Sequence, residues 1–483
     1  MIKKFGLLTD LYQITMAQGY FDANIHKKMA CFDMFYRENP SENGYAVFAG
    51  LEQLIEYIEN LKFYDDDIEY LRGQKMFSEG FLNELSNFKF DGDIFSVQEG
   101  EIIFPNEPII KIKSSLFSAQ IIETALLNII NHQSLIATKA ARIAYAAGDD
   151  SVIEFGLRRA QGQSAGILGA RAAFIVGVAA TSNVLAGKLF SIPIKGTHAH
   201  SWIMSFDSEI EAFRAYAKSF PNSTILLVDT YNTLKSGVPN AIAVFKELKE
   251  QGQELKNYGI RLDSGDMAYL SKKAREMLDD SGFFDAKIVA SNDLDENIIQ
   301  SLKLQGAKID VWGVGTSLIT SIDSPAFGGV YKMVEIENEN GELVPKIKLS
   351  DNPEKITTPG SKKIYRIYDK KSGKIKADLI TLENETIDCA SKLVLFDPNA
   401  PWRRMTLPKN SFTIRNLHQH IYKNGKKIYT SPKIQEMQDF CKNELKNLWE
   451  EHKRLINPHI MPVDLSQTLY DLKQSLITQP QVD

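Results

Sequence analysis

In the middle of the chain, short apolar runs alternate with stretches of helical periodicity. The runs are Val152–Phe155, Phe174–Val178, Ile192–Ile194, Ile225–Val228, Gly259–Leu262, Lys287–Ala290 and Asp310–Val314. This repeated strand–helix pattern is typical of a parallel β/α barrel or a doubly wound sheet. Each run ends in polar or glycine-rich residues, and barrels carry their sites at the carboxyl ends of their strands. We therefore predict an α/β fold with an irregular (β/α) barrel of about seven strands. A flat doubly wound sheet is the second interpretation.

The two flanking segments have a different pattern. The N-terminal segment mixes helical periodicity with β-like runs, and hairpin signals follow later at Asn340-Gly341, Ser372-Gly373 and Asn424-Gly425. The pattern predicts a second α+β domain built from both ends of the chain. Its parts are an N-terminal α+β domain at 1–147 and a C-terminal hairpin and helical segment at 331–483 that packs on it. The barrel domain with the catalytic rim then occupies 148–330.

Composition narrows the class of protein. The chain has 483 residues, of which 43% are hydrophobic and 24% charged, as in ordinary globular proteins of several domains. A net charge of -5 argues against a general nucleic-acid binder. The most apolar stretch, 117–147, carries Glu123, Lys139 and Arg142, so we expect no membrane span. The 3 cysteines are far apart and the N-terminus lacks a secretory pattern, so we expect a cytoplasmic protein.

Two histidines stand out in the stretch SIPIKGTHAHSWIMSF, which starts at Ser191. His198 and His200 follow an apolar run and a Gly-Thr pair. Neutral imidazole is a usable nucleophile, although a histidine after a strand is also often only a structural hydrogen-bonding group. Metal-dependent amidohydrolase barrels carry an HxH pair too, but their metal needs further histidines at later strand ends. The next histidine here is His418, so that class stays a remote alternative, and we predict no metal-ligand motif.

Other strand ends add groups that could bind anions and hydroxyls. Arg261 and Asp263 alternate onto one side of a strand end, where they could grip a substrate or simply pair with each other. The sequence GVGTS could bring backbone amides to a phosphate, or form only a tight turn. Arginines for anions, carboxylates for hydroxyls or Mg²⁺ and a histidine nucleophile suit a phosphorylated sugar substrate. A non-catalytic nucleotide sensor would not need this density of reactive groups.

Several of these strings, in this order, resemble those of nicotinate phosphoribosyltransferases. They are LTDLYQ, EFGLRRAQG, GTHAHSW, VDTYNT, IRLDSGD, SNDLDE, GVGTS and NPHIMPVDLS, and they span nearly the whole chain. The resemblance implies a type II phosphoribosyltransferase, an irregular α/β barrel beside an α+β domain. It also implies transfer of phosphoribosyl from phosphoribosyl pyrophosphate to nicotinate, giving nicotinate mononucleotide and pyrophosphate for NAD biosynthesis. ATP is the co-substrate, through an enzyme phosphohistidine, and Mg²⁺ arrives with the nucleotide and pyrophosphate.

The resemblance also assigns roles to residues near the first strands of the barrel. His200 matches the phosphorylated histidine, whereas His198 falls at a variable position. Tyr12 and Thr197 match nicotinate contacts, and Tyr12 is expected to reach into the neighbouring subunit of a homodimer with shared active sites. Phe155 and Arg158 match the ring-stacking and anion-binding positions of EFGLR.

Later strand ends match further positions of the family. Arg261 matches a substrate-binding arginine, with Asp263 beside it. Asp229 and Asp293 match acidic positions on the rim. We assign Asp229 and Asp263 to catalysis with His200, and Asp293 to the phosphoribosyl donor. Gly315 and Thr316 match the phosphate-binding turn, which Gly313 precedes.

One position bears on the choice between acid and amide substrates. The related nicotinamide phosphoribosyltransferases carry an Asp where this chain has Ser182 in ATSNV. A carboxylate there would accept a hydrogen bond from an amide but repel the nicotinate carboxylate. Ser182 therefore favours nicotinate. Nicotinamide phosphoribosyltransferase remains the alternative function, and the shorter quinolinate phosphoribosyltransferases fit less well.

Overall fold

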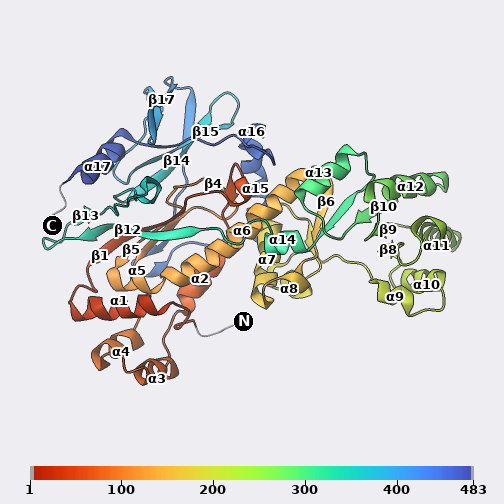
Figure 1. Ribbon diagram of the computed structural model, residues 1–483, viewed down its shortest axis with the longest axis horizontal. Coiled ribbons are helices and arrows are strands. Elements are labelled where there is room, and N and C mark those ends of the chain that lie inside the picture. Colours follow the sequence, from red (N-terminus) through yellow and green to blue (C-terminus); the bar gives the residue numbers. More distant parts are fainter. Residues whose placement is uncertain (1–4, 480–483) are drawn as a thin grey trace. The chain divides into compact units, whose positions relative to one another are not determined.

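The computed structural model describes residues 5–479 of the chain. The chain divides into two compact units, Met1–Thr138 with Ala326–Asp483, and Lys139–Pro325. We call the first the β-rich unit and the second the α/β unit (Figure 1). The outermost residues of the predicted segments 1–147 and 331–483, namely 1–4 and 480–483, lie outside the described residues.

The β-rich unit is built on a seven-stranded sheet of order β13-β12-β1-β5-β3-β19-β20. Its central strand β1 (Met29–Tyr36) pairs antiparallel with β12 (Gly329–Glu337) and with β5 (Ile110–Ser115). The remaining strands are β3 (Asp93–Ser96), β13 (Leu343–Pro345), β19 (Gln419–Lys423) and β20 (Lys426–Lys427). The residues of β1 are almost all buried, so both faces of this strand lie in the core.

Smaller sheets complete this unit. A four-stranded sheet has the order β18-β14-β15-β21. Its strands are β14 (Lys362–Asp369), β15 (Ile375–Leu382), β18 (Phe412–Asn416) and β21 (Val463–Leu465). Two pairs are β2 (Ala46–Val47) with β4 (Ile102–Ile103), and β16 (Leu393–Asp397) with β17 (Ala400–Leu407). The predicted hairpin turns are confirmed, because each of the three Asn-Gly or Ser-Gly pairs joins two paired antiparallel strands.

Helices flank these sheets. They are α1 (Leu11–Asp22), α2 (Leu51–Asn60), α3 (Asp65–Gly73), α4 (Glu79–Ser86), α5 (Leu116–Ile121), α15 (Ile434–Asn447), α16 (Glu450–Lys453) and α17 (Gln467–Thr478). Short helical turns occur at Pro40–Glu42 and Pro353–Lys355. Helix α6 (Glu123–Ala147) begins in this unit and ends in the α/β unit. Apolar side chains from α2, α4, α5 and α6 pack with β1 and β5 in one large core cluster.

The α/β unit contains six parallel strands of order β7-β6-β11-β10-β9-β8. They are β6 (Ser151–Glu154), β7 (Ala180–Thr181), β8 (Thr224–Leu227), β9 (Tyr258–Leu262), β10 (Lys287–Ala290) and β11 (Val311–Val314). The helices between them are α7 (Gln163–Ile175), α8 (Val184–Phe190), α9 (His200–Met204), α10 (Glu209–Ser219), α11 (Val238–Glu250), α12 (Met267–Asp280), α13 (Glu296–Leu304) and α14 (Thr316–Thr320). Short turns at Leu157–Arg159 and Thr233–Gly237 complete the unit.

Two of the expected strands differ from the prediction. The run Phe174–Val178 is not a strand, because Phe174 and Ile175 end helix α7 and the strand that follows is β7. A short apolar run fits a buried helix end as well as a buried strand. The run Ile192–Ile194 makes only a single parallel bridge, from Ile194 to Thr181. Pro193 has no N–H to donate, so the ladder cannot extend through it.

The strand order is that of an opened barrel. When Ile194 is counted beside β7, neighbours in the sheet follow the chain in circular order, with one gap between Ile194 and β8. A doubly wound sheet would instead reverse its order at a central switch point. Among the described residues, the gap leaves one edge of β8 without a partner strand. There the N–H of Leu227 donates to Nε2 of His198 at 3.3 Å.

Candidate functional site

Arg261, at the end of β9, connects several strand ends of the α/β unit. Its Nη1 donates to Oγ1 of Thr197 at 2.8 Å, and its Nε donates to Oγ of Ser291 at 2.8 Å. Nη2 donates to Oδ1 of Asp263 at 2.8 Å. The guanidinium carbon lies 5.8 Å from the ring centroid of Phe155. One half-buried cation therefore contacts groups that follow four segments of the unit, namely β6, the run at 192–194, β9 and β10.

Asp263 stays ionised within this network. Burial raises the pKa of its carboxyl, but the hydrogen bond from Ser291 and the Arg261 guanidinium outweigh burial, so the net pKa is lowered. The backbone N–H of Asp263 donates to Oδ2 of Asp229 at 2.7 Å, and the Ser264 hydroxyl donates to the same oxygen at 2.8 Å. Oδ1 of Asp229 is buried and has no partner within residues 5–479. Asp229 therefore keeps one oxygen available for a ligand.

His200 lies between a hydroxyl and a carboxylate. Its Nδ1 is 3.0 Å from Oγ1 of Thr230, and its Nε2 is 3.6 Å from Oδ2 of Asp263. The side chain is 39% exposed, so the ring can meet a substrate. A hydroxyl on Nδ1 fixes the plane of the ring. Sequence reasoning missed Thr230, although its place directly after Asp229 at a strand end was a usable signal.

His198 has a different setting, although only one residue separates it from His200. The side chain is buried, and its ring packs 4.6 Å from the ring of Tyr216. Burial lowers its pKa to about 4. Because Nε2 accepts the Leu227 N–H, the ring is neutral and carries its proton on Nδ1. His198 thus closes the gap in the sheet, which is a structural role.

A pocket of about 70 Å³, here called the rim pocket, opens at these strand ends. Its lining brings together eight of the residues predicted from sequence: Phe155, Arg158, Arg261, Asp263, Asp293, Gly313, Gly315 and Thr316. Arg159, which the sequence indicates as a second positive charge beside Arg158, also lines it, as do Ser291 and Asn292, which were missed. The backbone of Asn292 and Asp293 has positive φ angles of 81° and 23°. Such strain at non-glycine residues is typical of functional loops.

Four predicted residues of the α/β unit are outside this lining: His200, Thr197, Asp229 and Ser182. Thr197 is bonded to Arg261, and Asp229 is bonded to the backbone of Asp263. Ser182 is exposed at the end of β7, where its N–H donates to the carbonyl of Glu154 at 2.9 Å. Tyr12 belongs to the β-rich unit, where it lies on α1 and is 47% exposed.

The glycines of the GVGTS turn make room for an aromatic ring. A Cβ on Gly313 would lie 2.6 Å from the ring of Phe155, closer than atoms can approach. A Cβ on Gly315 would lie 3.1 Å from the Phe155 carbonyl oxygen, which is tight but less severe. Gly313 is therefore required by the position of Phe155, a reason that the sequence did not reveal.

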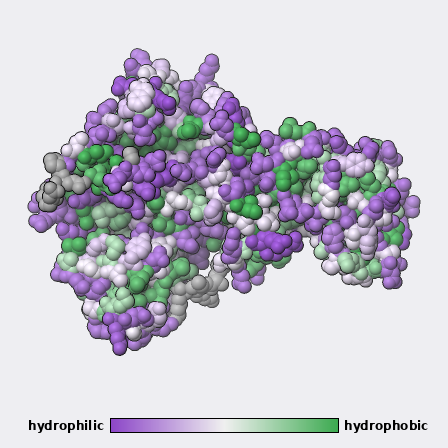
Figure 2. Space-filling view, viewed as in Figure 1, coloured by the Kyte–Doolittle hydropathy of each residue, from purple (hydrophilic) through white to green (hydrophobic). Residues whose placement is uncertain are grey.

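Neither a protein metal centre nor a membrane helix is found in residues 5–479. No group of three His, Cys, Asp or Glu side chains there is arranged to hold a metal ion. No helix in that range is long and apolar enough to cross a membrane. On the visible face, hydrophilic residues predominate and apolar ones form scattered small patches (Figure 2).

Comparison with known proteins gives consistent matches along the chain. Residues 7–131 match the N-terminal domain of nicotinate phosphoribosyltransferases, residues 151–388 match the nicotinate phosphoribosyltransferase family, and residues 361–473 match its C-terminal domain. The nicotinate phosphoribosyltransferase of Bacillus subtilis is 50% identical over 472 residues, covering 98% of this chain and 95% of that protein. That of Caenorhabditis elegans is 37% identical over 536 residues, covering 98% and 93%.

Solved structures agree with these matches. Human nicotinic acid phosphoribosyltransferase aligns with a TM-score of 0.85 at 28% identity, covering 97% of this chain and 99% of that one. A nicotinate-nucleotide pyrophosphorylase from Pyrococcus furiosus has a TM-score of 0.70 at 23% identity and shares the fold. The mixed α/β fold is confirmed, with a six-stranded parallel half-barrel in place of about seven strands.

Proposed function

Because this chain belongs to the nicotinate phosphoribosyltransferase family, we propose that it transfers phosphoribosyl from phosphoribosyl pyrophosphate to nicotinate. The products are nicotinate mononucleotide and pyrophosphate, in NAD biosynthesis. The observation that carries this proposal is the Arg261 network, which holds Phe155 and Thr197 on one side and Asp263 with His200 on the other. The residues proposed to bind the pyridine ring and those proposed to act on phosphate are thus all fixed by the same cation, Arg261.

Nicotinate is held by an aromatic face and two arginines in this proposal. The ring packs on Phe155, and Arg158 or Arg261 binds its carboxylate, since guanidinium matches a planar carboxylate at two points. The pyridine nitrogen then attacks C1 of the ribose as pyrophosphate leaves. Thr316 and the backbone amides that follow Gly313 and Gly315 receive phosphate oxygens. Asp293 contributes to the donor site at the strained loop.

ATP hydrolysis is coupled through His200 in this proposal. The Thr230 hydroxyl accepts Nδ1–H and leaves the Nε2 lone pair free to attack the γ-phosphorus. The Nε2–P bond forms, the bond from phosphorus to the bridging oxygen breaks, and ADP leaves. Asp263 would repel an incoming phosphate, but its ion pair with Arg261 offsets that charge. Asp229 supports this arrangement by holding the backbone of Asp263.

Magnesium is expected with the nucleotide and the pyrophosphate. Oδ1 of Asp229 is a buried oxygen without a partner in the described chain and is a suitable ligand for a hard cation. The rim carboxylates form no three-ligand cluster among residues 5–479, so the other ligands come from phosphate oxygens and water. Bound Mg²⁺ would neutralise phosphate charge, while the steps assigned to Arg261, Thr230 and His200 stay with the protein.

We also propose a homodimer in which Tyr12 completes the site of the partner. Leu11, Tyr12 and Met16 of α1 are exposed at 56%, 47% and 40%, so one helix carries three large apolar side chains that a partner could cover. Mixing inactive Tyr12→Ala chains with inactive His200→Ala chains should restore activity, because hybrid dimers hold one intact site. No recovery after demonstrated subunit exchange would contradict shared sites.

The main proposal is tested by product analysis. Nicotinate and nicotinamide are supplied together with phosphoribosyl pyrophosphate, with and without ATP, and the mononucleotides are quantified. We expect nicotinate mononucleotide to dominate and ATP to raise its yield. Equal or greater nicotinamide mononucleotide would favour the alternative function, and no mononucleotide of either kind would refute the proposal.

A further inference from the structure

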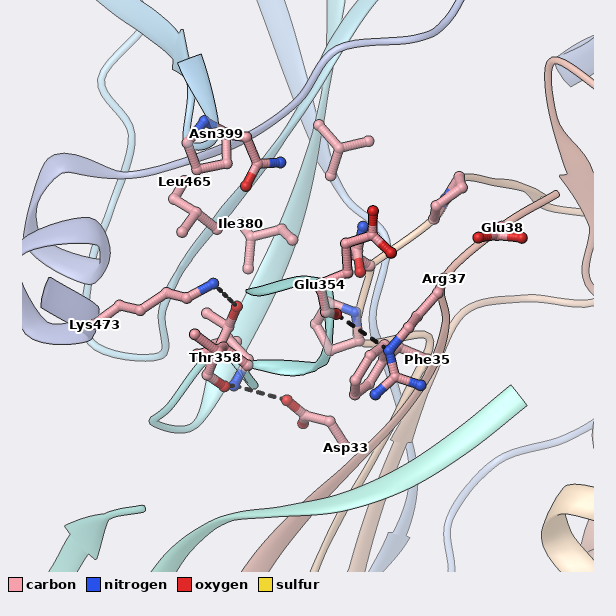
Figure 3. A pocket seen from close by; sticks show the side chains of 17 residues that line it. Asp33, Phe35, Arg37, Glu38, Glu354, Thr358, Ile380, Asn399, Leu465 and Lys473 are labelled. Atoms are coloured by element: carbon pink, nitrogen blue, oxygen red, sulfur yellow. Dashed lines mark hydrogen bonds and ion pairs between the residues drawn. The ribbon is translucent and has the colours of Figure 1, made fainter. Parts of the chain in front are cut away.

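A cavity of about 540 Å³ lies within the β-rich unit, and we call it the β-unit cavity. It is lined by residues of β1, β15, β21 and α17 and by the loops around 105–108, 354–362 and 398–399 (Figure 3). This volume falls in the range of small-molecule sites, about 300–1,000 Å³. All of these residues belong to one unit, so the cavity is a property of that unit alone.

The walls of the cavity combine apolar and polar side chains in similar numbers. Phe35, Ile380 and Leu465 face it, and three prolines add carbon surface. Ile380 and Leu465 are otherwise buried in the small cluster beneath α17. Ligand pockets combine the two kinds of surface, because apolar surface supplies affinity and polar groups fix orientation.

Lys473 brings an ammonium group without an ion-pair partner to the apolar part of this wall. The side chain is half-buried, and within residues 5–479 its Nζ has one hydrogen-bond partner, the Thr358 hydroxyl at 3.4 Å (Figure 3). No carboxylate of the described chain forms an ion pair with it. Burial and the neighbouring Lys362 lower its pKa. A half-buried ammonium without an anion is costly, and a bound anion would relieve that cost.

Lys362 lines the same cavity, but its ammonium group has a full set of hydrogen-bond and ion-pair partners. Its Nζ pairs with Oδ2 of Asp33 at 2.8 Å and donates to the carbonyls of Thr358 and Gly360 at 2.7 and 2.6 Å. All three protons are used, so Lys362 has no donor left for a ligand. Asp33 is only 1% exposed, and its Oδ1 has no partner within the described residues. This oxygen can accept one hydrogen bond from a ligand.

Arg37 lines the cavity as a second cation. Its Nε donates to the Glu354 carbonyl at 3.3 Å, and its guanidinium carbon lies 5.5 Å from the Phe35 ring centroid (Figure 3). The carboxylates of Glu38 and Glu354 also line the cavity, but both residues are exposed, so water screens their charge. The less exposed cations therefore outweigh these two acids inside the cavity.

We propose that the β-unit cavity binds a small amphipathic anion, a carboxylate or phosphate carried on an aromatic or aliphatic body. The anionic group pairs with Lys473, and the body packs against Phe35, Ile380 and Leu465. A donor on the ligand meets Oδ1 of Asp33. This site is separate from the rim pocket and does not depend on the proposed transferase activity.

Three coumarin probes of similar size separate the possible sources of the anion. They are 4-methylumbelliferyl phosphate, 7-methoxycoumarin-4-acetate and the neutral 7-methoxy-4-methylcoumarin, each titrated into the full chain by calorimetry. We expect at least one anionic probe to bind ten or more times more tightly than the neutral one. The phosphate probe alone indicates a phosphorylated ligand, and the acetate alone indicates a carboxylate.

Variants then locate the binding. Lys473→Met keeps the length of the side chain and should weaken the anionic probe by at least tenfold. Ile356→Trp should fill the cavity and abolish binding. Lys409→Met, an exposed lysine outside the cavity lining, is the matched control and should leave binding unchanged. Arg261→Ala in the rim pocket should also leave it unchanged, which separates this site from the transferase site.

Several results would overturn the proposal. Equal binding of charged and neutral probes, or no binding of any probe, would refute the proposed anion site. Unchanged affinity in both Lys473→Met and Ile356→Trp, or loss only in Arg261→Ala, places the probe elsewhere. Circular dichroism accompanies each titration, and if one of the two cavity variants unfolds, the result for the other decides.

Discussion

The rim pocket of about 70 Å³ and the β-unit cavity of about 540 Å³ hold their charges in opposite ways. In the rim pocket, Arg261 pairs with Asp263 and binds two hydroxyls, so its polar groups are fixed before a substrate arrives. In the cavity, Lys473 hydrogen-bonds only to the Thr358 hydroxyl within the described chain. Oδ1 of Asp33 has no hydrogen-bond partner there. Preorganised dipoles suit catalysis, whereas unpaired charges suit a bound ligand. Size alone therefore does not distinguish a proposed reactive site from a proposed binding site.

The strongest test of this contrast is covalent labelling. Incubation with γ-labelled ATP, followed by alkaline handling, should label the wild-type chain and should fail completely in His200→Ala. His198→Gln should keep the label, because its ring only bridges the sheet, and Lys473→Met should keep it because the cavity has no part in the reaction. Acid-labile phosphate on His200→Ala would show that the nucleophile is another residue.

The next largest effect concerns stability in acid. The folded pKa of His198 is about 4 and the unfolded value is 6.5, so between these pH values the unfolded chain binds more protons. Stability contributed by the neutral ring is present above pH 6.5 and is lost as pH falls to 4. At about 1.36 kcal/mol per pKa unit, the loss approaches about 3 kcal/mol.

The measurement is urea unfolding at pH 7 and pH 4.5 for wild type and His198→Gln. Glutamine keeps an acceptor for the Leu227 N–H but does not titrate. The variant should therefore lose less stability on acidification than the wild type. Equal losses in the two proteins would mean that His198 is not what makes the sheet acid-sensitive.

A negative charge introduced at Ser182 tests how the rim pocket selects the acid over the amide. Ser182→Asp should reduce the preference for nicotinate over nicotinamide by about 1–3 kcal/mol through repulsion of the carboxylate. Competition kinetics measures the ratio of kcat/KM for the two substrates. Ser182→Asn has a similar shape and no charge, so it should retain most of the preference. A similar loss in both variants would assign the effect to shape.

The smallest expected effect comes from adding a methyl group in the rim pocket or in the β-unit cavity. Gly313→Ala puts a methyl group against the Phe155 ring and should raise KM for nicotinate about tenfold, because a tight pocket cannot absorb a methyl group. Thr358→Val replaces a hydroxyl with a methyl in the β-unit cavity and should leave that KM unchanged. If KM for the phosphoribosyl donor rose more than KM for nicotinate, Gly313 would belong to the phosphate turn instead.

Most of the predicted rim residues lie together in the structure because the signals that predict their position are local. Each motif follows an apolar run, and carboxyl ends of parallel strands converge, so Arg261, Asp263 and Thr316 could be placed together. The single hydroxyl of Ser291 carries no pattern of its own, and only its distance to Arg261 identifies it. The β-unit cavity could not be predicted, since its lining comes from segments scattered between residues 33 and 473.

The wrong strand predictions have the same physical origin. An apolar run such as Phe174–Val178 indicates a buried segment, and a buried segment can be the end of a helix as well as a strand. Pro193 interrupts hydrogen bonding whatever the burial of its neighbours, which reduces Ile192–Ile194 to one bridge. Periodicity fixed the alternation of elements, while the count of strands depended on hydrogen bonds that composition does not encode.

The discontinuity of the β-rich unit also bears on how the chain is made. Strand β1 occupies residues 29–36, but one of its two sheet neighbours, β12, begins only at Gly329. During synthesis the α/β unit, a continuous segment from Lys139 to Pro325, emerges whole before that neighbour exists. Contacts between distant residues form late because closing long loops costs entropy. The α/β unit can therefore fold on the ribosome while one edge of β1 is still unpaired, because β12 has not yet been synthesised.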